Sequence, residues 1–179
     1  DAAVESSGLD VEKRFIALKK HEIRNMRSFC AIMANEGCTI GHFDGFFVSY
    51  TIAQIGKEID LLRFGNEYIL NIEVKSELKV AQKEHKILKQ MRENHYYLKF
   101  LGKPIRIYTY IENDGFYQYD DEHDVVVKIK VEFVANTLKD QTVDYTIDPD
   151  KEFIPSNYLI SPFNSTEQFI AGEYFLTSA

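Results

Sequence analysis

Three charged residues on two strand-like segments have the types and spacing of a metal-dependent hydrolytic site. Asp60 lies within the segment 58–64, and Glu73 and Lys75 end a second segment that begins near residue 67. Side chains alternate across a β-strand, so Glu73 and Lys75 are predicted to share one face. If the two segments pair as a hairpin, Asp60 comes close to that face, and the three charges meet at one edge of a sheet.

These residue types suit the hydrolysis of a phosphodiester bond. That reaction needs a cation to neutralise the phosphate, a nucleophilic water molecule and a donor that orients it. Asp60 and Glu73 supply hard oxygen ligands for Mg²⁺ or Mn²⁺, ions that keep several water molecules and bind through one or two carboxylates. Lys75 is predicted to orient or help deprotonate the water, and the backbone carbonyl of Val74 is a further candidate ligand.

The elements that must position these residues can be read from apolar periodicity and turn residues. The Gly65-Asn66 pair between the two segments is a hairpin signal. Three- and four-residue spacing predicts a helix over residues 9–35, and a second one over 77–101. Further strands are predicted at 46–50, 105–111, 116–119 and 125–133. This order predicts an α/β or α+β fold with one central mixed sheet flanked by helices and extra antiparallel strands toward the carboxyl end.

Glu22 is an unusual residue in the first predicted helix. It lies four residues from both Leu18 and Met26, so the helical period places its carboxylate in the middle of the apolar face. A charge is costly at such a position. One explanation is that Glu22 pairs with a buried arginine or caps a neighbouring element.

The runs Glu58-Ile59-Asp60-Leu61-Leu62 and Asn71-Ile72-Glu73-Val74-Lys75-Ser76 resemble the signature of the PD-(D/E)xK nuclease superfamily. Its members include restriction-like, Holliday-junction, RecB-type and nuclease-related domains. The resemblance covers roughly residues 22–111 and implies a restriction-endonuclease-like core and a metal-dependent nuclease acting on DNA.

The resemblance also implies two further site residues. An acidic residue on the first helix often joins the metal site in this superfamily, and Glu22 is at the matching position, with Glu12 as the fallback. RecB-like members carry a glutamine on the helix after the lysine strand, which corresponds to Gln90. On that helix Lys83, Lys86 and Tyr97 are predicted to share a flank with Gln90, either as a phosphate-binding surface or as an ordinary solvated face.

The carboxyl end carries a second resemblance. Residues 161–169 and 174–177 are similar to the lead-in to a helicase motor in proteins where a nuclease domain precedes an ATP-dependent helicase, but no phosphate-binding Gly-Lys-Thr loop is present. We therefore expect a nuclease-like domain at 9–135, an extension or linker at 136–179, and a helicase domain as the partner in a longer chain. A chain that begins without Met fits this expectation.

Composition limits the alternatives. The 21 basic and 28 acidic residues give a formal charge of −7, which argues against binding nucleic acid by bulk electrostatics. No apolar run reaches the length of a membrane helix and no secretory signal begins the chain, so a cytoplasmic protein is expected. Cys30 and Cys38 fit neither a disulfide framework nor a metal cluster.

The sequence is also compatible with two other functions. One is a nuclease-like module that no longer cuts and positions nucleic acid for a helicase. The other is RNA cleavage, because cap-snatching viral endonucleases use a similar acidic and lysine arrangement. An acidic residue followed two positions later by lysine also occurs by chance on exposed strands, where the two serve as cross-strand partners.

Overall fold

The computed structural model describes residues 20–53, 55–76 and 83–154, and the side chains from residue 23 onward. Its elements are, in chain order, α2 (Lys20–Asn35), η1 (Ile40–Phe43), β1 (Phe47–Ile52), β2 (Lys57–Phe64), β3 (Ile69–Lys75), α3 (Lys83–Leu98), η2 (Lys99–Leu101), β4 (Ile105–Ile111), β5 (Gly115–Asp120), β6 (Val125–Ile129), α4 (Val131–Asp140) and α5 (Pro149–Glu152). The chain is an α/β protein with a six-stranded mixed sheet, as the sequence predicts.

The strands lie in the sheet in their chain order, β1-β2-β3-β4-β5-β6. Only β3 and β4 are parallel to each other, and α3 forms the connection between them. All other neighbours are antiparallel, including the predicted hairpin of β2 and β3. The hairpin signal at Gly65-Asn66 is thereby confirmed, and β5 and β6 are the extra antiparallel strands expected toward the carboxyl end.

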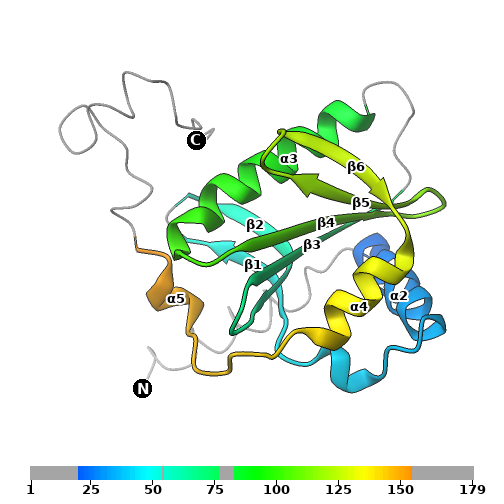
Figure 1. Ribbon diagram of the computed structural model, residues 1–179, viewed down its shortest axis with the longest axis horizontal. Helices are drawn as coiled ribbons and strands as arrows, with labels where there is room; N and C mark the ends of the chain where they lie inside the picture. Colours follow the sequence, from blue (N-terminus) through cyan, green and yellow to red (C-terminus); the bar gives the residue numbers. More distant parts are fainter. Residues whose placement is uncertain (1–19, 54, 77–82, 155–179) are drawn as a thin grey trace, which may run out of the picture.

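Helices cover both faces of the sheet (Figure 1). On one face, Phe29 and Met33 of α2 and Leu138 of α4 pack in a single core with Leu70 and Ile72 of β3. On the other face, the apolar side of α3 packs on the sheet. Ile87 and Met91 join one core with β4 and β5, and Tyr97 and Leu98 join another with β1, β2 and Phe153.

Two predicted boundaries differ from the structure. The strand predicted over 125–133 ends at Ile129, and α4 begins two residues later at Val131. The alternation of apolar residues in the strand continues into the apolar spacing of the helix, so the pattern alone does not separate them. The second predicted helix, 77–101, is α-helical as far as Leu98 and passes into η2 at Lys99, and the predicted start at 77–82 lies outside the described residues.

The carboxyl part of the described chain packs against the sheet. The boundary predicted between residues 135 and 136 falls inside α4, where Val134, Ala135 and Leu138 are buried in the same core as β3. Phe153 is also buried, in the core beside β1 and β2. The segments that resemble a helicase lead-in, within residues 161–177, lie outside the described residues.

Arg63 ties this carboxyl part to β2. Its guanidinium is buried and donates to the carbonyl of Leu138 at 3.1 Å, to the carbonyl of His42 at 2.7 Å and to the side chain of Gln141 at 2.6 Å. Burial lowers the pKa of Arg63 from its ordinary value. Because a buried cation needs such acceptors, α4 and the segment after it complete the environment of a central strand.

Candidate active site at the opening between two strands

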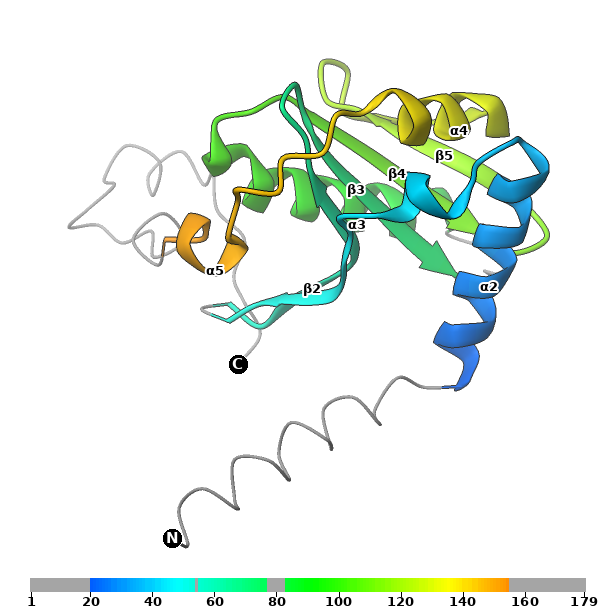
Figure 2. The same ribbon diagram turned by 90° about the horizontal axis from the view of Figure 1, so that it is seen from below.

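The candidate site lies where β2 and β3 separate. Their ladder contains the pairs from Phe64 with Ile69 to Leu61 with Ile72, and it ends there although both strands continue. Beyond this point β2 stays paired with β1, and Figure 2 shows β2 diverging from β3. The opening exposes backbone groups that a continued ladder would have satisfied.

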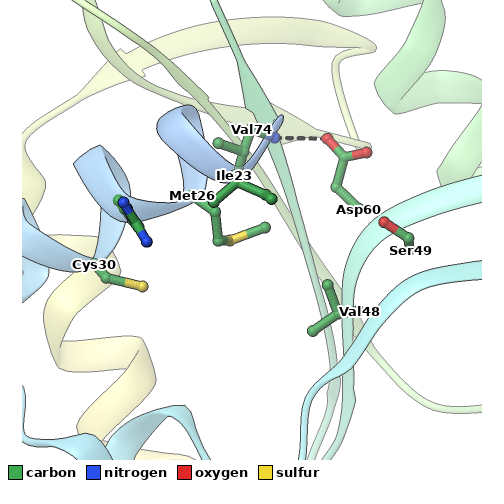
Figure 3. Close-up of a pocket in the computed structure, with 8 residues that line it drawn as sticks. Ile23, Met26, Cys30, Val48, Ser49, Asp60 and Val74 are labelled. Carbon is green, nitrogen blue, oxygen red and sulfur yellow. Dashed lines mark hydrogen bonds between the residues drawn. The ribbon is translucent and has the colours of Figure 1, made fainter. Parts of the chain in front are cut away.

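Asp60 fills this opening. Its carboxylate accepts a hydrogen bond of 2.8 Å from the backbone N–H of Val74 on β3 (Figure 3). Continuing the register of the ladder places Asp60 opposite Glu73, and opposite residues of an antiparallel pair point to the same face. The structure therefore brings the acidic residue of the first strand to the Glu73-Val74-Lys75 segment, as the sequence predicts.

Glu73 is completely buried, with 0% of its surface exposed. One carboxylate oxygen, Oε1, accepts from the side-chain amide of Asn71 at 3.1 Å and from that of Asn94 at 2.8 Å. The other oxygen, Oε2, accepts a short hydrogen bond from the side-chain amide of Gln90. Gln90 thus lies against Glu73.

The electrostatics of Glu73 follow from this burial. Its pKa is raised from 4.5 to about 7, first because burial penalises the ionised form and next because the negative charge of Asp60 is close. The positive charge of Lys75 and the amide of Asn71 act in the opposite direction. Lys75 is half-buried and its ammonium group makes no hydrogen bond or ion pair with the described residues, so this charge is available near Glu73.

Asn71 and Asn94 are members of the site that the sequence did not single out. Asn94 also donates to Asn71 at 2.8 Å, so the two amides and Glu73 form one buried network with α3. Two oxygen atoms beside it, Oδ1 of Asn94 and Oγ1 of Thr109, are buried and have no partner in the described structure. Thr109 pairs with Glu73 in the parallel ladder of β3 and β4. The sequence signal that could have indicated Asn71 is the presence of an amide side chain within the apolar run Leu70-Asn71-Ile72.

The other sequence-predicted members of the site have different positions. Glu22 belongs to α2, but its side chain lies outside the described residues, as does Glu12. Tyr97, predicted beside Gln90 on an open flank, is buried in the core. Lys83 on that flank forms an ion pair of 2.6 Å with Asp114, so its charge is neutralised within the protein. These contacts favour the solvated, ion-paired interpretation of the lysine-rich face.

The two carboxylates fit a divalent cation. The carboxylates of Asp60 and Glu73 bring two negative charges close together at a partly buried position. A cation that prefers oxygen ligands would compensate these charges. A carboxylate has about four lone-pair sites, and the three amide donors leave one of those on Glu73 free. No group of three or more His, Cys, Asp or Glu side chains suited to a metal occurs within the described part of the chain. A third ligand there would be a backbone carbonyl such as that of Val74.

A pocket of about 230 Å³ opens beside Asp60, between α2 and the first strands. Figure 3 shows Met26 and Cys30 of α2 on one side of it and Val48 and Ser49 of β1 on the other. Ser49 has a positive φ of 49°, which is uncommon for a residue with a side chain. Strained backbone of this kind occurs often at functional sites.

No protein-family model, curated protein or solved structure matches this chain. Among the helices of the described residues, none has both the length and the apolar character that crossing a membrane requires.

Proposed function

We propose that this chain is a divalent-metal-dependent nuclease domain that hydrolyses phosphodiester bonds of DNA on a restriction-endonuclease-like core. The observation that carries the proposal is the meeting of Asp60 and Glu73 at the opening between β2 and β3, with Lys75 two positions further on. Mg²⁺ or Mn²⁺ held there would neutralise charge on the phosphate and make a bound water molecule acidic.

The residues of the chain have separate roles in this proposal. Asp60 and Glu73 are the carboxylate ligands, with the carbonyl of Val74 and the carboxylate of Glu22 as further candidates. Lys75 positions the attacking water through its ammonium group. The Glu73 carboxylate is held in one orientation by the amides of Gln90, Asn71 and Asn94. It therefore loses little conformational freedom when it binds a metal ion.

A second function is favoured by one specific observation. Both oxygens of Glu73 already accept amide hydrogen bonds and the side chain is fully buried. This arrangement also suits a structural carboxylate in a nuclease-like module that no longer cuts and instead positions nucleic acid for an attached helicase. Metal binding separates the two functions, because only the nuclease requires it.

The test combines calorimetry with a cleavage assay. Wild-type protein is titrated with Mn²⁺ and incubated with single-stranded DNA, duplex DNA and RNA in Mg²⁺ or Mn²⁺. Asp60→Asn should abolish both metal binding and cleavage, while Asp140→Asn, an exposed change at the end of α4, should leave both unchanged. Cleavage by Asp60→Asn at the wild-type rate would refute the proposal, and absence of Mn²⁺ binding would favour the inactive module.

A further inference from the structure

The pocket beside Asp60 has properties that the proposed metal chemistry does not use. Its walls are mainly apolar and come from Met26 and Cys30 of α2, Val48 of β1 and Val74 of β3 (Figure 3). An apolar wall does not compensate the charge of a phosphate group, so a phosphate is not the natural occupant. The walls suit a flat, weakly polar ring.

The size of the pocket restricts that ring further. Its volume of about 230 Å³ is below the range of roughly 300–1,000 Å³ found for sites of drug-sized ligands. One planar ring system fits such a space, whereas a base pair does not. The few polar groups in the lining, among them Ser49, leave little means of reading the edge of a base.

The rim of the pocket provides charge at two points. Asp60, a proposed metal ligand, lines the pocket, whereas Glu73 contacts α3, so a metal-bound phosphate would lie at the opening between β2 and β3, at the rim of the pocket. Arg27 lines the pocket from α2 and is exposed, and its guanidinium makes no hydrogen bond or ion pair with any other described residue. A nucleotide has its base joined through one sugar to its phosphates, so a base in the pocket would bring phosphates to the rim.

We propose that this pocket binds one unpaired base of single-stranded DNA, with Arg27 contacting a neighbouring phosphate. The inference rests on the proposed nuclease function and names the substrate class of the same site. A base enters a pocket only when it has no pairing partner or has left the helix, which has an energetic cost in intact duplex. Since apolar contact with a base face depends little on base identity, the pocket selects strandedness and not sequence.

The experiment measures binding apart from cleavage. The affinity of a fluorescein-labelled 12-nucleotide single strand is compared with that of the same sequence as duplex, by fluorescence anisotropy in Ca²⁺. Val48→Trp places an indole at the pocket from β1, where Val48 is 52% exposed. Val125→Trp is the matched control, because Val125 is 42% exposed on β6 at the opposite edge of the sheet.

We expect the single strand to bind more tightly than the duplex, and Val48→Trp to weaken it about tenfold or more. Val125→Trp should leave the affinity unchanged. Arg27→Ala should reduce the slope of log affinity against log salt concentration by about one. Equal binding of single strand and duplex, or equal effects of the two tryptophan variants, would overturn the inference, and tighter binding of RNA of the same sequence would overturn the choice of DNA.

These experiments distinguish a failure of the proposed nuclease function from a failure of the proposed base-binding pocket. If no DNA is cut in Mg²⁺ or Mn²⁺ while Val48→Trp alone loses single-strand binding, the nuclease function fails and the pocket assignment stands. If single strand and duplex are cut equally and Val48→Trp has no effect, the nuclease function stands and the pocket assignment fails.

Discussion

The backbone N–H of Val74 donates a hydrogen bond of 2.8 Å to the carboxylate of Asp60. This single contact joins the two strands after their ladder has ended, and it fixes Asp60 beside the segment that contains Glu73 and Lys75. It also satisfies a backbone donor that the opening would otherwise leave without a partner on β2.

Lys75→Ala should abolish metal-dependent cleavage without unfolding the protein. Its ammonium group is half-buried and has no hydrogen-bond or ion-pair partner within the described residues, so its removal breaks no observed ion pair. The loss expected for a water-positioning group is about a hundredfold or more in kcat. Rates are measured in Mn²⁺, and the thermal midpoint is measured on the same samples.

Lys86→Ala is the control for this change, because Lys86 is exposed on α3 and also lacks an ion-pair partner among the described residues. It should cleave at the wild-type rate. If Lys75→Ala and Lys86→Ala have the same activity, Lys75 has no role in the chemistry.

The stability of the metal-free protein should fall as pH rises from about 4.5 to 7. In the unfolded chain Glu73 ionises near its ordinary pKa of 4.5, whereas burial and the charge of Asp60 raise its pKa in the folded protein to about 7. The folded state therefore holds a proton that the unfolded state has released, and raising the pH favours unfolding in this window. The free energy of unfolding should decrease by about 3 kcal/mol.

Glu73→Gln tests this assignment, because a neutral amide of similar shape has no such titration. Its free energy of unfolding, measured by urea denaturation in EDTA, should lack this decrease, so that the variant becomes the more stable protein above pH 7. Adding Mn²⁺ at pH 8 should stabilise wild type and not the variant. Parallel pH profiles for the two proteins would contradict the raised pKa of Glu73.

Asn71→Ala should shift metal binding to higher pH. The amide of Asn71 donates to Glu73 and lowers its pKa, so its removal makes the carboxylate still harder to ionise. A metal ion must displace the proton on its ligand, so the apparent affinity for Mn²⁺ at pH 7 should fall about tenfold and recover partly at pH 9. Asn66→Ala, in the exposed turn between β2 and β3, should bind Mn²⁺ like wild type at both values.

Arg63→Met should lower the free energy of unfolding by about 3 kcal/mol, because it leaves buried acceptors on His42, Leu138 and Gln141 without their donor. Arg106→Met is the control. Arg106 is exposed on β4 and lies 4.0 Å from the ring centre of Tyr68, a contact whose loss should cost about 0.5–1 kcal/mol. Chemical denaturation measures both values, and equal losses would show that the buried contacts of Arg63 contribute little.

The strands around the site could be predicted because their signals are local. The turn at Gly65-Asn66 and the alternation on either side of it determine the β2–β3 hairpin, and hence the meeting of Asp60 with Glu73. The apolar spacing over 77–101 also predicted the helix that contains Gln90, which is α3. In each case neighbouring residues carried the information.

The rest of the site could not be predicted, because it depends on contacts between distant elements. Asn94 is an ordinary amide in a polar helix until α3 folds over β3, and only then does it contact Glu73.

Helix α4 was missed for a different reason. Its apolar residues directly follow the alternating strand β6, and its burial depends on the core that it shares with α2.

The order of the strands in the sheet has a consequence for how the chain folds. Each strand lies beside the one that precedes it in the sequence, and only the step from β3 to β4 requires a crossover. Short loops close at little entropic cost, so the β2–β3 hairpin can form early in folding. Pulse-labelled hydrogen exchange during refolding should show the amides of this hairpin protected no later than those of β4. The opening that holds Asp60 would then be shaped early, before α3 brings Gln90 and Asn94 to Glu73.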